Sequence, residues 1–327
     1  MTREPVVDAL ITGWAVMVDE VQLTIALLRS NWTAHCGNSV ACLLTRFFNA
    51  SLAPKHLRGL LPGMTIITFA FSYSFDIANQ AFSVEEDSIN KPDRPIVSGR
   101  LDIKGAYVRW FLSWILFPAL IYLMVDSSAA TILILWELWV LVFYIWPKVD
   151  HWIARNVFTA LGAVLQLSLL DSFLTEALPD YQVDTSLTCL LFSWLVMTIH
   201  VQEFHDMEGD RATGRRTLPL LLGSRGQLVL RATTATIIAG TAVANLLRAS
   251  MYPGRNIHSM PADMIGLAGC HLASMMVVAI RLITMRWKEA DKVTYKYCYT
   301  LATYIMLLFH ASIEKLPIEE NTGSYRS

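Results

Sequence analysis

The chain has 327 residues, of which 54% are hydrophobic and only 16% charged, and its mean hydropathy is +0.43. This composition lies far outside that of ordinary soluble domains and is typical of a protein that crosses a membrane several times. The formal net charge is −1, so no general attraction to nucleic acid is expected. The five cysteines contain no C-x-x-C pair, so neither a disulfide framework nor a zinc site is indicated.

Residues up to about Leu28 form an amphipathic lead that carries Asp8, Asp19 and Glu20. These charges interrupt the apolar run, so the lead is predicted to lie on the membrane surface rather than to span it. The first residues lack a basic segment before an apolar core, so no signal peptide is predicted. The chain is therefore divided into an N-terminal lead (1–30), a transmembrane domain (31–315) and a C-terminal tail (316–327).

Nine apolar segments follow the lead, each close to the length of about 20 residues that a membrane-crossing helix needs. They are residues 32–50, 60–83, 105–125, 129–146, 152–174, 186–202, 227–247, 262–285 and 293–312. The loops after the second, fourth, sixth and eighth segments hold most of the lysines and arginines, which places these loops in the cytosol by the positive-inside rule. The predicted fold is an all-α polytopic membrane bundle of nine transmembrane helices around one central cavity.

An acidic stretch ends the second apolar segment, where residues 76–96 read DIANQAFSVEEDSINKPDRPI. At about 100° per residue, a continuous helix would gather several oxygen-bearing side chains on one face. These are Asp76, Asn79, Ser83 and Asp87, with Glu86 just outside the arc. Oxygen ligands followed by Lys91 and Arg94 would suit Mg²⁺ bridging to a phosphate, although taken alone the stretch also fits a solvated helix end.

A second acidic stretch follows the sixth apolar segment, where residues 203–223 read EFHDMEGDRATGRRTLPLLLG. Glu203, Asp206 and Asp210 fall at i, i+3 and i+7, which is one stripe of a helix. Carboxylates on one stripe repel each other unless a positive charge lies between them. The arginines Arg211, Arg215 and Arg216 follow directly. Two such stripes on one chain predict a shared metal centre.

A third polar loop spans residues 144–156, between the fourth and fifth apolar segments. Lys148 in this loop is a candidate diphosphate contact, but a lysine beside Trp146 and Trp152 is equally typical of a membrane interface. Arg29, at the entry to the first segment, is in a similar position. Both alternatives stay open for these two cations.

Aromatic residues recur along the predicted helices and are candidates for the lining of a cavity. They include Phe69, Phe71, Tyr73 and Phe75 on the second segment and Trp110, Trp114, Phe158 and Trp194 on others. Aromatic faces stabilise cations by roughly 0.5–2 kcal/mol each. Because aromatic side chains on membrane helices more often face lipid or pack against neighbours, none of them is assigned a role.

Taken together, these residues resemble the UbiA-type membrane-integral prenyltransferases, a family with nine transmembrane helices and two aspartate-rich motifs on the second and sixth. The resemblance covers nearly the whole chain. The first motif is matched by Asn79, Asp87, Asn90, Pro92, Arg94, Pro95 and Ile96, and the second by Glu203, Asp206, Asp210, Arg211, Gly214, Thr217 and Leu218. Lys148 resembles the family's lysine between the fourth and fifth helices, and Arg29 its first-helix arginine.

The resemblance implies that residues 31–315 form a catalytic domain with a Mg²⁺ cofactor and an isoprenoid diphosphate substrate. The implied metal site comprises Asn79, Ser83, Glu86, Asp87, Glu203, Asp206 and Asp210. The implied diphosphate contacts are Arg29, Lys91, Arg94, Lys148, Arg211 and Arg215. It further implies a multi-pass protein of the endoplasmic reticulum membrane with cytosolic active-site loops. No nucleic acid and no obligate protein partner are expected, and the base that ends the reaction is unassigned.

The chain departs from the family pattern at Gln80 and Ser83, where the family has aspartates, and at Glu203, the first acid of the second motif. The resulting pattern N-Q-x-x-S-x-x-E-D-x-x-N-K-P resembles the fungal UbiA-type terpene cyclases of secondary metabolism. This favours a membrane-bound class I-type terpene cyclase that ionises farnesyl or geranylgeranyl diphosphate with Mg²⁺ and cyclises the carbocation. One alternative is a prenyltransferase that uses an aromatic acceptor. Another is an ion-coupled transporter, although acids at helix ends followed by arginines suit a phosphate site better than an ion-transport site.

Overall fold

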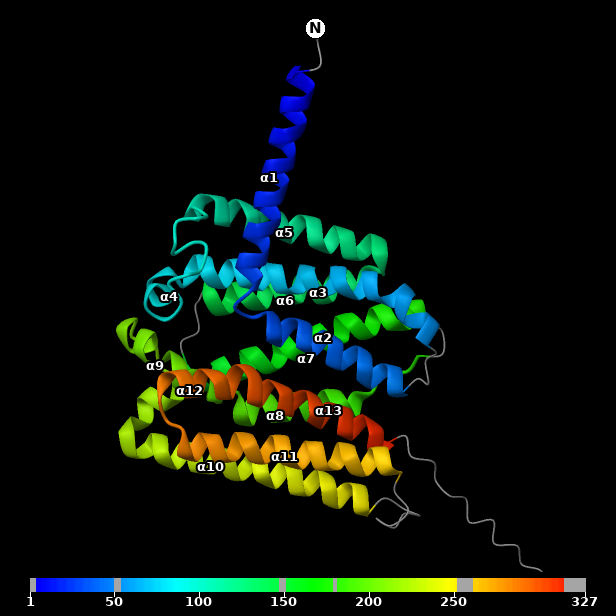
Figure 1. Cartoon of the computed structure of the whole chain (residues 1–327), viewed down its shortest axis with the longest axis vertical. Helices are drawn as coiled ribbons and strands as arrows, with labels where there is room; N and C mark the ends of the chain where they lie inside the picture. The colour runs from blue at the N-terminus through cyan, green and yellow to red at the C-terminus, as the bar shows by residue number, and fades with distance from the viewer. Residues whose placement is uncertain (1–3, 50–53, 147–150, 179–180, 252–260, 315–327) are drawn as a thin grey trace, which may run out of the picture.

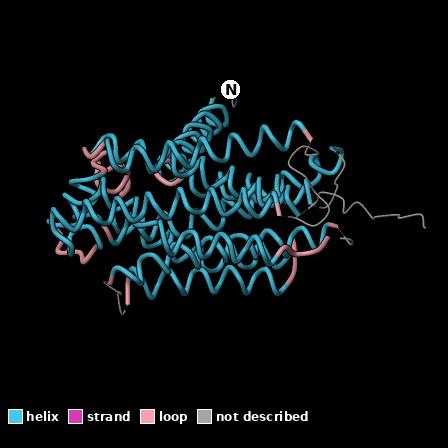
Figure 2. The backbone as a smooth tube through the Cα atoms, turned by 90° about the horizontal axis from the view of Figure 1, so that it is seen from below, coloured by secondary structure: helices cyan, strands magenta, loops and turns pink. Residues whose placement is uncertain are grey.

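The computed structural model describes residues 4–49, 54–146, 151–178, 181–251 and 261–314. Within these ranges all regular secondary structure is helical, as Figure 2 shows, which confirms the predicted all-α class. Lys148, one of the predicted diphosphate contacts, lies outside the described residues.

Ten long helices make up most of the described chain. In order they are α1 (Glu4–Leu28), α2 (Trp32–Asn49), α3 (Pro54–Phe82), α5 (Ile103–Met124), α6 (Ser127–Tyr144), α7 (Trp152–Ala177), α8 (Thr185–Thr198), α10 (Leu218–Ser250), α11 (Ala262–Thr284) and α13 (Thr300–Glu314). Short elements lie between them: α4 (Val84–Asn90), the 3₁₀ helix η1 (Ile199–Gln202), α9 (Glu203–Ala212), α12 (Lys288–Val293) and the π-helix η3 (Thr294–Tyr299).

The long helices from α2 onward pack into one closed bundle (Figure 1). Helices that follow each other in the chain lie side by side, as α5 does with α6, α6 with α7 and α10 with α11. The last helix, α13, packs against α2 as well as α11, so the two ends of the bundle meet. The short helices α4, α9 and α12 gather at one end of the bundle, where α9 contacts both of the others.

Eight helical stretches among the described residues are long and apolar enough to cross a membrane, so the chain is a multi-pass integral membrane protein. The predicted count of nine is not reproduced, because the polar helix α2 and the short helix α13 are not among the eight. The residues Ala9–Leu28 of α1 are one of them by length and composition, but α1 runs across the direction of the other long helices in Figure 1, so its position on the membrane surface stays a prediction. Helix α1 is continuous past Asp19 and Glu20, and only its last turns pack on α3, through Leu23 and Leu27.

The first acidic stretch contains a helix break, and the second begins at one. Helix α3 ends at Phe82, Ser83 is non-helical, and α4 restarts at Val84. The prediction of one continuous face from Asp76 to Asp87 is therefore wrong, because the two residues lie on different helices. The second stretch behaves as predicted, since Glu203, Asp206 and Asp210 all lie on α9, which follows the 3₁₀ turn η1.

Candidate active site

The two acidic helices, α4 and α9, are held in direct contact. Asn90 at the end of α4 donates a hydrogen bond to the carbonyl of Asp206 (3.1 Å) and accepts one from the backbone N–H of Gly209 (3.3 Å). A Cβ at position 209 would overlap the side chain of Asn90, so the close approach requires glycine. The tertiary fold thus brings together two motifs that are more than a hundred residues apart.

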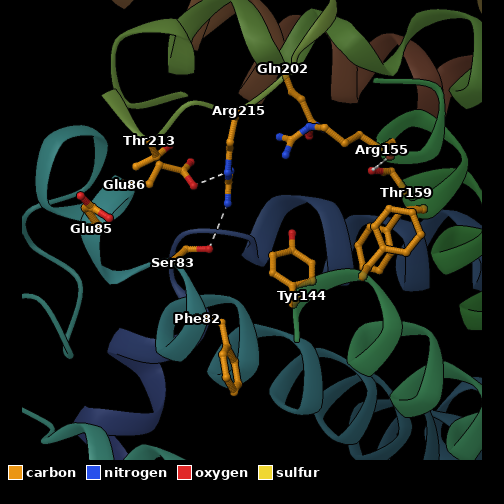
Figure 3. A pocket seen from close by; sticks show the side chains of 12 residues that line it. Phe82, Ser83, Glu85, Glu86, Tyr144, Arg155, Thr159, Gln202, Thr213 and Arg215 are labelled. Carbon is orange, nitrogen blue, oxygen red and sulfur yellow. Dashed lines mark hydrogen bonds and ion pairs between the residues drawn. The ribbon is translucent and has the colours of Figure 1, made fainter. Parts of the chain in front are cut away.

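A central cavity opens at this end of the bundle and runs inward between the helices. Two contiguous pockets form it and share Glu86, Tyr144, Arg155 and Arg215 among their lining residues. Its polar end, drawn in Figure 3, contains side chains from α4, α7 and the segment after α9. The cavity therefore begins between the acidic helices and reaches the apolar interior.

Arg215 connects the two acidic helices (Figure 3). Its Nη2 donates to Ser83 Oγ at 3.1 Å, and its Nη1 lies 3.4 Å from Asp210 Oδ1 and also pairs with Glu86. The same guanidinium thus pairs with one carboxylate on α4 and with a second carboxylate on α9. Ser83, where the family motif has an aspartate, contributes a neutral acceptor to this cluster.

Arg155, which is not among the residues predicted from sequence, lines both parts of the cavity. Its Nε lies 3.1 Å from Glu203 Oε1, and the other oxygen of Glu203 accepts the backbone N–H of Leu218 at 3.2 Å. A sequence signal for Arg155 exists, because Thr159 and Gln166 follow at i+4 and i+11 on one face of an apolar helix. All three line the cavity.

Asp87 is buried and pairs with Arg94, whose Nη1 lies 2.6 Å from Asp87 Oδ2 and whose Nε donates to Ser30 Oγ at 3.2 Å. Burial raises the pKa of Asp87 above its ordinary value, while the positive charges of Arg94 and Lys91 oppose this shift. Asp87 is not among the described residues that line the central cavity, and neither is Asp210. Asp210 is joined to the lining by its contact with Arg215, and Asp87 is next in the chain to Glu86, which lines the cavity.

The remaining predicted residues divide between the cavity and the surface. Asn79, Lys91 and Asp206 line the cavity, and Lys91 Nζ lies 3.7 Å from Asp206 Oδ2. Arg29 instead forms an exposed ion pair with Asp93, and Arg211 is exposed on α9 outside the cavity lining. The structure therefore groups most of the predicted set but leaves these two arginines at its edge.

The donor set fits Mg²⁺, although no group of three His, Cys, Asp or Glu side chains among the described residues is already gathered around one point. The acids instead pair with guanidinium groups, as Asp87 does with Arg94 and Asp210 with Arg215. Among the described residues, Asp87 Oδ1 and Asp210 Oδ2 are buried without a hydrogen-bond partner. Buried carboxylate oxygens are costly unless a cation or donor satisfies them, and an all-oxygen donor set is the one Mg²⁺ prefers.

The inner part of the cavity has aromatic walls. Phe71 stacks on Trp136 with ring centroids 4.4 Å apart, and Phe158 lies 5.6 Å from the same indole. Tyr295 and Tyr299, from the π-helix η3, also line the cavity, on the side of η3 and α13. Gly162 permits the approach of Trp136, because a Cβ there would lie 2.7 Å from the indole ring.

The aromatic candidates of α3 divide by helical face. Phe71 and Phe75, one turn apart, line the cavity. Phe69 and Tyr73 lie on another face and each pack against Phe117 at 5.7 Å. Trp110 and Trp114 pack against each other at 5.6 Å, and Trp194 stacks on Tyr299 at the same separation. These four residues of α3 lie two positions apart in the sequence, so alternate members fall on opposite faces of the helix. One pair therefore lines the cavity, and the other packs against Phe117.

Residues 39–313 match the model of the UbiA prenyltransferase family, and the chain belongs to this family. Somaliensene A/B synthase of Streptomyces somaliensis is 29% identical over 302 residues, which are 89% of this chain and 94% of that protein. Diterpene cyclase eriG of Hericium erinaceus is 32% identical over 161 residues, which are 49% of this chain and 51% of that protein. Polyprenyl transferase eriF of the same fungus is 32% identical over 157 residues, 48% and 53% of the two chains.

Two solved structures share the fold. A UbiA homolog from Archaeoglobus fulgidus bound to GPP and Mg²⁺ matches with a TM-score of 0.57 over 89% of this chain and 99% of that chain, at 14% identity. The structure of a digeranylgeranylglyceryl phosphate synthase matches with a TM-score of 0.53 over 90% and 99%, at 18% identity. Identities this low support the common fold alone. The fold and the family match together define a UbiA-family membrane enzyme.

Proposed function

We propose that this protein is a membrane-bound class I-type terpene cyclase that ionises farnesyl or geranylgeranyl diphosphate and cyclises the resulting carbocation. The observation that carries the proposal is a single cavity that joins a cluster of acids and arginines to a chamber walled by Phe71, Phe75, Trp136 and Phe158. The similarity to a somaliensene synthase over most of both chains, and to a diterpene cyclase over about half of each, supports the same class.

The charged end of the cavity would bind the diphosphate together with Mg²⁺. Asp87, Asp206 and Asp210 would hold the metal, with Asn79, Ser83, Glu86 and Glu203 completing or orienting the set. When bound, Mg²⁺ neutralises the charge of the diphosphate and makes it a better leaving group. The guanidinium groups now paired with these acids would then be free to contact the phosphate oxygens.

Arg155, Arg215 and Lys91 line the cavity and would supply the charge-assisted hydrogen bonds to the diphosphate. Arg215 contacts Glu86 on α4 and Asp210 on α9, so it lies where it could bind a diphosphate held between the two acidic helices. Arg94 reaches the site through Asp87. Arg29 and Arg211 lie outside the cavity lining and would attract the diphosphate as it approaches the site.

The aromatic chamber would fold the prenyl chain and exclude water from the carbocation. Each aromatic face contributes roughly 0.5–2 kcal/mol of cation stabilisation, and exclusion of water prevents premature quenching to a linear alcohol. Because the double bonds of the prenyl chain itself act as the nucleophile, the enzyme needs only one substrate. The thinned acid set at Ser83 agrees with this one-substrate chemistry.

A prenyltransferase that uses an aromatic acceptor is the second candidate function. The similarity to polyprenyl transferase eriF favours it, at the same identity as to the diterpene cyclase and over a stretch of similar length. The two functions share the ionisation step and differ in whether a second substrate must be bound. They are therefore separated by supplying no acceptor.

The deciding experiment incubates membranes that contain the protein with Mg²⁺ and farnesyl or geranylgeranyl diphosphate alone and examines the extract by gas chromatography with mass detection. We expect a cyclic hydrocarbon or alcohol that is absent with EDTA and absent from an Asp210→Ala variant. Unreacted diphosphate or linear prenyl alcohol as the only products would refute the cyclase and direct the search to aromatic acceptors. We further propose that the protein resides in the endoplasmic reticulum membrane with α4 and α9 at the cytosolic face.

A further inference from the structure

A second polar cavity lies beside the central one and is lined by an excess of cations. We call it the basic vestibule, and its cations are Arg29, Lys91, Arg94, Lys288, Lys292 and Lys296. Among the described residues, the carboxylates on its lining are only Asp93, Asp206 and Glu289. Lys91 and Asp206 also line the central cavity, so the two spaces adjoin at this ion pair.

The three lysines from the end of the chain follow at i, i+4 and i+8 on α12 and η3. Like charges at this spacing repel each other, so the arrangement is unfavourable unless an anion is nearby. Lys288 and Lys292 form exposed ion pairs with Glu208 and Glu289, which offset the repulsion only slightly. Lys296 is half-buried, and within the described residues its side-chain ammonium makes no hydrogen bond or ion pair.

The segment that carries these lysines is firmly anchored. The guanidinium of Arg231 binds both oxygens of Asp291 on α12 at 2.7 Å, in a buried bidentate pair. Arg281 Nε donates to Thr294 Oγ1 at 3.0 Å at the start of the π-helix. Single π-turns are rare and occur frequently at functional sites. Consecutive residues of this turn separate the two spaces, because Tyr295 lines the central cavity and Lys296 lines the vestibule.

We propose that the basic vestibule binds a diphosphate-class anion and is the route by which inorganic diphosphate leaves the central cavity. This inference rests on the proposed function, since it takes the diphosphate to be released beside Asp206. Lys91, which lines both cavities, passes the anion from the metal site to Lys296. Lys288 and Lys292 then deliver it to solvent, while the apolar product leaves through the bilayer. A phospholipid headgroup carries the same phosphate chemistry and is the competing source.

The test measures binding of inorganic diphosphate to the purified full-length protein by calorimetry in the presence of EDTA. Without metal the central site lacks the Mg²⁺ on which the proposed function depends, and Lys296 lines the vestibule but not the central cavity, so the part of the signal that depends on Lys296 reports the vestibule. We expect Lys296→Gln to weaken binding about tenfold, as loss of one charge-assisted contact does. Lys296→Arg keeps the charge and should bind as the wild type does. Lys104→Gln removes an exposed lysine at the start of α5, outside the vestibule lining, and should change nothing.

In an active preparation, the inhibition constant for diphosphate as product should rise by the same factor in Lys296→Gln, with KM for the prenyl diphosphate unchanged within about twofold. Equal diphosphate binding by Lys296→Gln and wild type would overturn the inference. In nanodiscs, loss of phosphatidic acid binding by Lys296→Gln without loss of diphosphate binding would also overturn it, because that result would assign the cavity to a lipid headgroup. Because the calorimetric arm needs no turnover, a failed cyclase assay leaves its result readable.

Discussion

Two buried carboxylates at opposite ends of the bundle, Asp171 and Asp210, have contrasting surroundings. Both oxygens of Asp171 are occupied, by Arg46 Nε and Nη2 at 2.9 Å each and by the hydroxyl of Tyr181 at 2.5 Å. Asp210 shares Arg215 with Glu86 and Ser83, and its Oδ2 has no partner among the described residues. A saturated pair holds α2 to α7, whereas an unsaturated one leaves room for a ligand. The unpartnered oxygen distinguishes Asp210 from the similarly buried Asp171 and supports the proposed role of Asp210 in binding a ligand.

The largest effect expected from this comparison is on Asp210. We predict that Asp210→Asn lowers turnover of the prenyl diphosphate by about a thousandfold, because one charged ligand of the diphosphate–metal cluster is lost. The protein should still fold, since Asn fills the same volume. Turnover measured by product formation, together with the thermal unfolding temperature in detergent, checks both statements. Glu208→Gln, an exposed acid on the same helix, is the matched control, and an active Asp210→Asn enzyme would remove Asp210 from the site.

The second-largest effect is expected at Asp171, at the opposite end of the bundle. Asp171→Asn leaves the guanidinium of Arg46 buried without its charge partner, so we predict a loss of about 3 kcal/mol of stability with turnover per folded molecule unchanged. The double variant Arg46→Met/Asp171→Leu removes both charges and should recover most of that stability. Chemical unfolding of the purified protein measures the loss. A drop in turnover per folded molecule would show that this pair also serves the reaction.

An effect of intermediate size is expected at Arg155. Replacing it with Gln removes a cation that lines the cavity, while Glu203 keeps the backbone N–H of Leu218 as a hydrogen-bond donor. We predict a rise of about tenfold in KM for the prenyl diphosphate, as expected for one charge-assisted contact. Arg225→Gln, which removes an exposed arginine of α10 just after Gly223, should leave KM unchanged. Steady-state kinetics of the three proteins decide whether Arg155 contacts the substrate.

The smallest effect is expected at Ser83. Ser83→Asp would restore a carboxylate at the position where the family motif has one and would strengthen the acceptor that Arg215 now contacts at 3.1 Å. We predict about a threefold change in the Mg²⁺ concentration that gives half-maximal activity, with no gain of prenyl transfer to aromatic acceptors. Titration of activity with Mg²⁺, with and without an acceptor present, measures both. The appearance of a prenylated acceptor would show that Ser83 alone separates the two reactions.

The sequence by itself determined the class of fold and predicted most residues of the candidate site. Apolar runs of spanning length predicted the membrane bundle, because their composition leaves few alternatives. The stripe of Glu203, Asp206 and Asp210 was predicted correctly, since residues on one short helix obey its periodicity. Periodicity failed where the helix did not continue, and the break at Ser83 separates Asp76 from Asp87.

Only the tertiary structure decided which residues meet across elements. Gln80, a departure from the family motif, is buried and donates to the carbonyl of Leu27 at 2.7 Å, so it faces α1 and not the cavity. Arg155 entered the site, and Arg29 and Arg211 were left at its edge, because each position depends on the packing of helices far apart in the chain. Local patterns report which residues share a face of one helix. The partner of that face is fixed by the packing of the whole bundle.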